Sequence, residues 1–360
     1  MKLSYFMMPV HDHRKDYHQT LEEDLEAVVH ADQLGFDEVW IGEHYTSRVE
    51  QITSPLMFMA SLIARTERIK FATGVICMPQ YHPALVAGQA AMFDHLSNGR
   101  FIMGIGPGGL PPDFELYQTT DQDRGEMMLE AIDIILKLWA SDPPYHIAGK
   151  YWNINVKEWV YDDIGLGHMA KPLQKPHPPI AVSAMSPYSG MMRLAAVRDW
   201  EPVSANFIGN WSVKSHWDTH LDECEKQQRE PQPERWRVAR SVYVADSDAE
   251  AEAFVKQQDG AFDYYYRYLF TIFDRADMKK AFITQPGMDP ADLTHERLRD
   301  ELVICGSPQT VTEKLLQFRE EVGPFGNLVM TAHDWTDKEK LKRSMELMAT
   351  EVIPAINQAS

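Results

Sequence analysis

The chain has 360 residues, of which 44% are hydrophobic, and a formal net charge of −18 at pH 7. So acidic a protein is not expected to bind nucleic acid or anionic membranes, because both require a basic patch. Three widely spaced cysteines argue against a disulfide framework or a zinc site, and no apolar run is long enough for a signal peptide or membrane span, so we expect a cytoplasmic protein.

The first half of the chain alternates short apolar runs with longer amphipathic ones. We predict strands at residues 2–8, 36–42, 69–78 and 100–106, and helices at residues 18–34, 54–66, 83–97 and 124–140. Ser54 followed by Pro55 is typical of a helix start. Four such units in about 140 residues indicate a parallel sheet with right-handed crossovers.

The second half is interrupted more often. We predict strands at residues 178–184, 201–207, 236–245 and 325–334, and excursions near residues 107–122, 141–178 and 248–304. Further helices are expected after Pro187 and at residues 212–229, 307–323 and 336–349. Eight strands without a splitting linker predict one α/β domain, a (β/α)8 TIM barrel over residues 1–360, whose active site lies at the carboxyl ends of the strands.

Two short motifs at these strand ends have competing explanations. GIGPGG at residues 104–109 matches the dinucleotide pattern G-x-G-x-x-G, but Pro111 and Pro112 follow, and we do not expect them to begin a helix. The glycines then mark either close approach of the backbone to a flat group or an ordinary turn. His11 and His13 in HDH are typical of metal-dependent hydrolases on this barrel, with Asp334 as a further ligand.

Such a hydrolase also needs histidines after strands five and six, where this chain has SAMS and SANF. We therefore interpret HDH as surface-loop residues and predict no metal. In SAMSPYSG, residues 183–190, hydroxyls at a helix start suit a phosphate, or Ser186 simply caps the helix. His44 and His82 follow strands two and three, so they either face one pocket or are ordinary hydrogen-bonded polar residues.

Five segments in order carry a resemblance across nearly the whole chain. They are GFDEVWIGEHY, GVICMPQYHP, DHLSNGRFIMGIGPGG, DRGEMMLEAIDIILKLW and GSPQTVTEKL. Together they resemble bacterial luciferase and its flavin-dependent monooxygenase relatives, in particular the limonene monooxygenase-like branch. The resemblance implies a luciferase-like barrel and a two-component system, in which a separate NAD(P)H:flavin reductase supplies reduced FMN. The enzyme would activate O2 as a C4a-(hydro)peroxyflavin and oxygenate a small apolar molecule.

The resemblance also implies roles for individual residues. His44 would transfer a proton at the reactive flavin edge, with Tyr45, where many relatives have a second histidine, and His82 as further catalytic candidates. Gly74 and Val75, often joined by a cis peptide in the family, would lie under the isoalloxazine. The other cofactor-binding candidates, mostly for the phosphate, are Gly106 (where luciferase has a reactive cysteine), Arg124, Met185, Ser186, Ser189 and Gly190.

An apolar set at the barrel mouth is the predicted substrate pocket: Met8, Phe207, Trp211, Met330 and Trp335. Family relatives pair as homodimers, so we expect contact through the helices at residues 54–66 and 83–97. Three alternatives remain: a deazaflavin-dependent oxidoreductase of the same fold, a metal-dependent TIM-barrel hydrolase and a flavin-binding protein without activity. The sequence leaves the role of Glu43 open.

Overall fold

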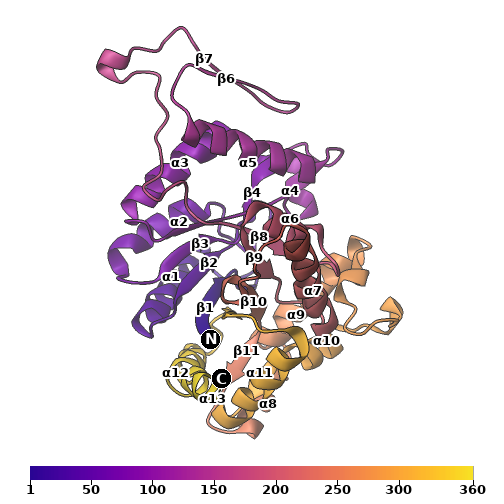
Figure 1. Cartoon of the computed structure of the whole chain (residues 1–360). Coiled ribbons are helices and arrows are strands. Elements are labelled where there is room, and N and C mark those ends of the chain that lie inside the picture. The colour runs from indigo at the N-terminus through magenta and orange to yellow at the C-terminus, as the bar shows by residue number, and fades with distance from the viewer. Residues whose placement is uncertain (360) are drawn as a thin grey trace.

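A closed ring of parallel strands forms the centre of the computed structural model, which describes residues 1–359 (Figure 1). Within that range, and in ring order, the strands are β1 (Lys2–Met7), β2 (Glu38–Ile41), β3 (Lys70–Thr73), β5 (Phe101–Gly106), β8 (Ile180–Ala184), β9 (Glu201–Ser204), β10 (Arg237–Arg240) and β13 (Asn327–Thr331). β13 pairs with β1, Lys2 opposite Asn327, which closes the ring. The predicted (β/α)8 barrel is confirmed.

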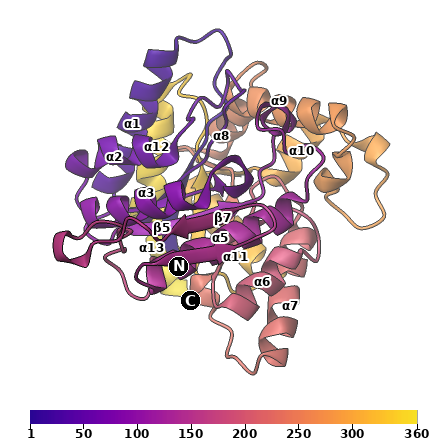
Figure 2. The ribbon, with the colours of Figure 1, turned by 90° about the horizontal axis from the view of Figure 1, so that it is seen from above.

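Helices surround this ring, as the view from above also shows (Figure 2). In chain order they are α1 (Tyr17–Gln33), α2 (Pro55–Leu62), α3 (Pro83–Leu96), α5 (Arg124–Ala140), α6 (Gly190–Arg198), α7 (Asn210–Lys226), α11 (Pro308–Val322), α12 (Lys338–Leu347) and α13 (Ile353–Ala359). A π-helical turn, Met348–Val352, joins the last two. Short 3-10 turns occur at Ile63–Arg65, Met78–Gln80, Asp162–Ile164, Pro233–Arg235, Lys279–Phe282 and Pro290–Asp292.

Side chains alternate between the inside of the barrel and the layer beneath the helices, as the pleat of a strand requires. Phe6 and Trp40 join the inner cluster, whereas Tyr5 and Met7 pack in the outer one. At the amino ends of the strands, Arg237 pairs with Glu38 at 2.6 Å and with Glu201 at 2.5 Å, all buried. These paired charges fill that end, so an active site is left to the opposite, carboxyl end.

Two of the predicted strands are each split in two. The strand predicted at residues 69–78 stops at Thr73 and resumes as β4 (Ile76–Cys77), and the Gly74–Val75 peptide between them is cis, as expected. The strand predicted at residues 236–245 ends in the barrel at Arg240. Its continuation, β11 (Val242–Val244), leaves the ring to pair with β12 (Ile304–Gly306), a strand that we did not predict.

The three excursions contain structure of their own. The expectation that Pro111 and Pro112 would not begin a helix was wrong: α4 (Pro111–Leu116) starts there, because the first helical positions need no backbone donor. The second excursion is a hairpin of β6 (Tyr145–Ala148) and β7 (Asn153–Val156) that projects beyond α5 in Figure 1. The third holds α8 (Asp248–Val255), α9 (Ala261–Arg275) and α10 (His295–Leu302).

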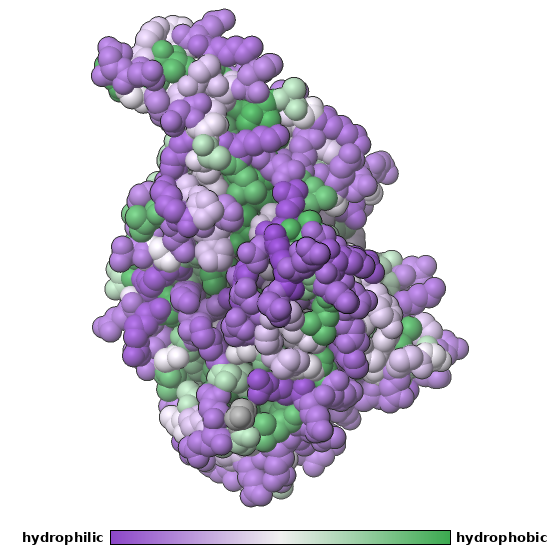
Figure 3. All heavy atoms as spheres, in the orientation of Figure 1, coloured by the Kyte–Doolittle hydropathy of each residue, from purple (hydrophilic) through white to green (hydrophobic). Residues whose placement is uncertain are grey.

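The ends of the chain lie side by side, and Asn357 Nδ2 donates to Met1 O at 3.1 Å. The face drawn in Figure 3 is mostly hydrophilic, with separate hydrophobic patches, in keeping with the large negative charge. Within residues 1–359, every helix is too short or too polar to cross a lipid bilayer.

Candidate functional site

The end of β2 places His44 at the carboxyl end of the barrel. β2 is wholly buried, and the chain leaves it through Gly42, over which the Met8 side chain lies: a Cβ there would come within 2.1 Å of Met8 Sδ. The His44 side chain is only 14% exposed. Its Nδ1 lies 3.4 Å from Asp113 Oδ2 and its Nε2 lies 3.8 Å from Glu50 Oε2. The imidazole is therefore held between two carboxylates.

Asp113 anchors this loop from the first turn of α4. Its carboxylate is 1% exposed and accepts hydrogen bonds from the backbone N–H of Tyr45 and Thr46 and from the Thr46 hydroxyl. Sequence reasoning missed Asp113 because the two prolines before it were taken to prevent a helix. An acidic residue in the first turn after such a pair is a helix-start signal that could have identified it.

The charges around His44 set its protonation. Burial favours the neutral ring, but Glu50 and Asp113 outweigh it and raise the pKa of His44. Burial also works to raise the pKa of Asp113, yet its hydrogen bonds with His44, Thr46 and Tyr45 lower it overall. The ring is thus disposed to keep its proton near neutral pH beside an ionised partner, which is what a proton donor needs.

Glu43, next to His44, points to a different neighbour. It is 3% exposed, and its carboxylate accepts from Cys77 N at 2.7 Å and from the Tyr81 hydroxyl at 2.8 Å. Tyr81 is also hydrogen-bonded to the Tyr45 hydroxyl. Burial raises the pKa of Glu43 to about 7, although the Cys77 and Tyr81 bonds act in the opposite direction. A connected polar network thus joins the ends of β2 and β4.

The glycines at the ends of β3 and β5 allow close backbone packing. A Cβ on Gly106 would come within 2.6 Å of Val75 Cγ2, and one on Gly74 within 3.2 Å of the Phe6 ring. The structure therefore brings Gly106 into contact with Val75, which follows Gly74 in the chain.

The loop after β8 presents its hydroxyls at the start of α6. The helix is capped by Ser189, whose Oγ accepts from Met191 N at 3.3 Å, and not by Ser186 as the simpler interpretation had it. Ser186, Met185 and Gly190 are exposed, and a Cβ on Gly190 would meet nothing within 4 Å. The exposed Ser186 hydroxyl and the open space at a helix N-terminus fit a phosphate group, whereas Ser189 is buried.

A buried histidine that sequence reasoning missed fixes this loop. His216 Nε2 lies 2.8 Å from Ser186 O, so it donates there, and Nδ1 then accepts from Ser204 Oγ at 3.0 Å. Trp236 Nε1 donates to the same Ser204 hydroxyl at 3.0 Å. Burial lowers the pKa of His216 to about 4, so the ring stays neutral and the bonding pattern holds across the neutral range.

Arg124 lies at the start of α5, with its guanidinium 3.8 Å from the centre of the Phe114 ring. One terminal nitrogen donates to Thr119 O at 3.3 Å. Its Nε is buried and has no hydrogen-bond partner among residues 1–359. Protein atoms cover this nitrogen, so only the terminal nitrogens of Arg124 are left for the predicted phosphate contact.

Within the described part of the chain, His82 shares no hydrogen-bond partner with His44. It is exposed, and its Nδ1 accepts from Ala84 N at 3.3 Å as the N-cap of α3. In that position it caps the start of a helix.

The predicted pocket residues divide into two groups. Phe207 packs against Phe273 at 5.5 Å between ring centres, and Trp211 Nε1 donates to Ile283 O at 2.8 Å, so both contact the third excursion. Met330 instead packs in the outer layer, as does Trp335, whose ring lies 5.6 Å from Lys338 Nζ. The structure does not bring Met330 and Trp335 to the barrel mouth.

The third excursion also reaches the His44 loop. From α9, the Tyr268 hydroxyl lies 3.3 Å from Glu50 Oε2 and 3.0 Å from Ser47 Oγ. Burial raises the pKa of Glu50, and His44 is the main group that opposes this. No periodicity marks Glu50 in the sequence, so only tertiary packing reveals that this carboxyl faces His44.

The interpretation of HDH as a surface loop was wrong for His11, which is 2% exposed. His11 Nδ1 lies 2.7 Å from Asp334 Oδ1, and Nε2 lies 3.2 Å from Asp24 Oδ1. The ligand atoms of His11, Glu23 and Asp334 lie within 4.8 Å of one another, but the Lys15 ammonium pairs with both of those carboxylates. A lysine cation therefore occupies the charge position that a metal would take.

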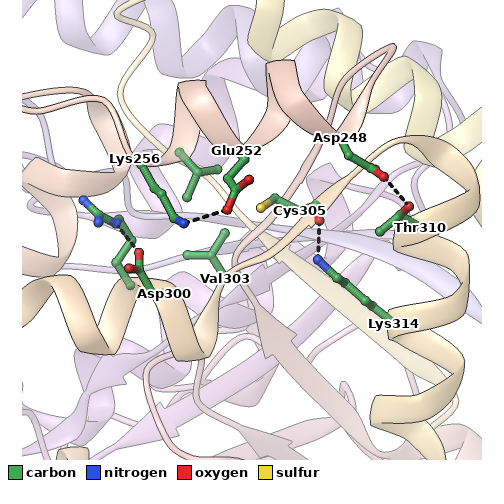
Figure 4. A pocket seen from close by; sticks show the side chains of 10 residues that line it. Asp248, Glu252, Lys256, Asp300, Val303, Cys305, Thr310 and Lys314 are labelled. Carbon is green, nitrogen blue, oxygen red and sulfur yellow. Dashed lines mark hydrogen bonds and ion pairs between the residues drawn. The ribbon is translucent and has the colours of Figure 1, made fainter.

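A cleft of about 260 Å³ lies elsewhere, among α8, α10, β12 and α11 (Figure 4). Four of its charged groups form ion pairs, Lys256 with Glu252 at 2.6 Å and Arg299 with Asp300 at 2.8 Å, and Asp248 and Lys314 are hydrogen-bonded to Thr310 and to Cys305 O. It contains none of the predicted site residues.

Comparison with known proteins gives matches over most of the chain. The model of the luciferase-like monooxygenase family matches residues 1–324. The chain is 32% identical to 3,6-diketocamphane 1,6-monooxygenase of Pseudomonas putida, over 94% of this chain and 93% of that protein. It is 29% identical to limonene 1,2-monooxygenase of Rhodococcus erythropolis, over 98% of this chain and 86% of that protein.

Among solved structures, a similar one is a type II Baeyer–Villiger monooxygenase, the oxygenating constituent of 3,6-diketocamphane monooxygenase from a Pseudomonas putida plasmid, in complex with FMN. It has a TM-score of 0.89 and 31% identity, with 99% of this chain and 98% of that chain covered. An F420-dependent secondary alcohol dehydrogenase shares the fold at a TM-score of 0.72 and 18% identity, with 99% of this chain and 98% of that chain covered.

Proposed function

Because the chain belongs to the luciferase-like monooxygenase family, we propose that His44 is the proton-transferring residue of a site in which FMN lies between the His44 loop and the start of α6. The protein is an FMN-dependent monooxygenase, the oxygenase component of a two-component system. The observation that carries the assignment of His44 is its position at the end of β2, buried between Asp113 and Glu50.

Reduced FMN, when bound, supplies the electrons that activate O2 for transfer of one oxygen atom. The residues of the chain do the rest. His44 keeps a proton available, and Asp113 holds the ring through Nδ1. Gly74 and Val75 would support the isoalloxazine, and Ser186, Ser189 and Gly190 would hold the phosphate, with Arg124 to balance its charge.

We propose a small apolar substrate, bound near Met8, Phe207 and Trp211. The aromatic side chains around Phe207 form a buried cluster with α9, which keeps water away from the reacting atoms. The named relatives oxidise diketocamphane and limonene, which supports this class. The third excursion, through Tyr268 and Phe273, would set the shape of the pocket.

A separate flavin reductase and O2 complete the reaction. We further propose a homodimer that forms through α2 and α3. The support is a set of exposed apolar side chains on these helices: Met57, 75% exposed, and Leu85, Met92 and Leu96, each more than half exposed. A cytoplasmic location fits the free cysteines Cys77, Cys224 and Cys305. Light scattering of the wild type and of Met92→Lys would test the dimer, with loss of the dimer expected in the variant.

The function is tested by supplying the protein with FMN, NADH, a generic flavin reductase and a panel of terpenes and cyclic ketones under ¹⁸O2. One ¹⁸O atom in the product is the expected result, as oxygenase chemistry requires. Turnover only with a deazaflavin, and without label, would instead support the hydride-transfer alternative. FMN binding without any product from the panel would support a flavin-binding protein without activity.

A further inference from the structure

Glu43 is buried, ionisable and not yet used by the proposed reaction. Its two oxygens face two different parts of the chain: Oε1 accepts from Cys77 N at 2.7 Å, and Oε2 accepts from the Tyr81 hydroxyl at 2.8 Å. Cys77 lies in β4, two residues beyond the Gly74–Val75 peptide. One carboxylate therefore links the strand end that carries His44 to the backbone segment that would support the flavin.

The ionisation of Glu43 decides the strength and the direction of these two links. An ionised carboxylate has acceptors only, so it can receive both the Cys77 N–H and the Tyr81 O–H. A protonated carboxyl must place its own hydrogen somewhere, and Cys77 N–H cannot accept it. The hydrogen would then be donated to Tyr81, and the direction of that bond would reverse.

The reversal would extend along a row of tyrosines. A Tyr81 that gives its one proton to Glu43 can only accept from Tyr45, to which it is hydrogen-bonded. The Tyr45 ring in turn meets the edge of Tyr117, with ring centres 5.0 Å apart. With Glu43 ionised, the Tyr81 hydroxyl donates to Glu43 and the Tyr45 hydroxyl donates to Tyr81. With Glu43 protonated, Tyr45 is free to donate outward.

We propose that ionised Glu43 is a positioning residue that holds residues 74–77 in register with the His44 loop through Cys77 N and the row formed by Tyr81 and Tyr45. This inference rests on the proposed use of FMN, since it concerns the segment on which the flavin would lie. Protonation of Glu43 weakens flavin binding because the hydrogen bond that Cys77 N–H donates is then no longer charge-assisted, so the supporting segment is held less firmly.

Other ionisable groups face Glu43 from the neighbouring elements: Cys77, Tyr81, Tyr45, Tyr117 and His44. Burial raises the pKa of Cys77 and of the three tyrosines, so these four groups remain neutral where Glu43 titrates. His44 is the remaining group, and a variant of Glu43 itself separates the two titrations.

The test is the dissociation constant for oxidised FMN, followed by quenching of flavin fluorescence between about pH 5.5 and about pH 8.5. For the wild type we expect affinity to fall about five- to tenfold as pH decreases through the neutral range, the loss of one charge-assisted hydrogen bond. Glu43→Gln should bind FMN weakly at every pH, with no such pH dependence. Glu43→Asp should recover part of the pH dependence. Riboflavin has no phosphate to titrate. Its affinity should show the same pH dependence as that of FMN, because the dependence comes from Glu43 and not from the phosphate.

Tyr81→Phe provides a second measurement if Glu43→Gln does not fold, as judged by near-UV circular dichroism. It removes one bond that holds down the pKa of Glu43, so the midpoint should move to higher pH. Tyr151→Phe is the matched control, because the Tyr151 hydroxyl also donates to a carboxylate, Glu126, at 2.8 Å, but on the exposed surface. Its profile should equal that of the wild type.

A pH dependence that is unchanged in Glu43→Gln, or a midpoint unmoved in a folded Tyr81→Phe, would overturn the inference. So would a wild type whose flavin affinity is constant across the range. A wild type that binds neither FMN nor riboflavin would refute the proposed function instead, so the two failures are distinguishable.

Discussion

At the His44 end of the proposed site the charged groups are buried and paired with one another, whereas at the Ser186 end the side chains are exposed and the space around Gly190 is open. The first end is organised before any ligand arrives, and its groups depend on one another. The second end is organised only by the backbone, which His216 holds from behind. Changes at His44 and Asp113 should therefore affect the chemical step, and changes at the second end should affect affinity alone.

Replacement of His44 should have the largest effect and would test the first half of that comparison. His44→Ala should lower kcat by about 10²- to 10⁴-fold, the usual contribution of a positioned proton donor, with FMN affinity nearly unchanged. Product formation under saturating reduced FMN measures it. His82→Ala is the control, and it should lose only the cap of α3, about 1 kcal/mol of stability. Equal losses of activity in both variants would contradict the separation of the two histidines.

His11, outside the proposed site, tests whether a buried charge pair contributes more to the stability of the protein than an exposed one. Burial opposes its charge, but bonds to Asp24 and Asp334 raise the pKa of His11 to about 9. The stabilisation is therefore fully present below the unfolded-state pKa of about 6.5 and is lost as pH rises through about 9. Between about pH 6 and about pH 9.5 the unfolding free energy of the wild type should decrease, in part because His11 loses its proton. In His11→Gln this decrease should be smaller by on the order of 2–3 kcal/mol.

Urea denaturation at the two pH values measures this difference. His168→Gln is its control, because the His168–Asp162 pair has a similar distance, 2.9 Å, but is exposed, at 36% and 83% of the two side chains. Exposed pairs contribute little. If His168→Gln changed the pH dependence as much as His11→Gln, burial would not be the deciding factor.

Asp113→Asn should have a smaller and more specific effect. The amide still accepts a hydrogen bond from the loop but carries no charge, so one of the three groups that raise the pKa of His44 (Glu50, Asp113 and Glu43) is lost. We expect kcat to fall about tenfold, and the limb of the pH–rate profile due to His44 to move to lower pH. Asp133→Asn, which removes an exposed pair with Arg198, should leave the profile where it is. If this limb did not move in Asp113→Asn, Asp113 would have no influence on the pKa of His44.

Ser186→Ala should have the smallest effect and tests the second half of the comparison. FMN affinity should fall about fivefold, the cost of one hydrogen bond to a charged group, with kcat at saturation unchanged. Riboflavin affinity should stay as it is in the wild type. Both constants come from fluorescence titration, with Ser141→Ala, whose hydroxyl bonds Lys137 O on the surface, as the control. Equal losses for FMN and riboflavin would exclude a phosphate contact at Ser186.

Local patterns in the sequence predict much of this molecule. The alternation of apolar strands and amphipathic helices predicts the barrel, since each such unit can bury its apolar side in only one arrangement. His44 can be predicted as well, because a strand that ends in charged residues marks the carboxyl face. The alternation of side chains along β13 would also have excluded Met330 from the pocket. Val329 belongs to the inner cluster, so its neighbour Met330 must point outward.

What the sequence determined by itself is which residues stand at the strand ends, because strand period and turn chemistry are local. What only the tertiary structure decided is which of them meet. Asp113 and Glu50 approach His44 from two other loops, and Tyr268 reaches Glu50 across 218 positions of the chain. Such contacts depend on how loops fold over the barrel mouth, and the buried charges there are stable only because they find one another. Glu43 is ambiguous in the sequence for the same reason, since its role depends on Cys77 and Tyr81.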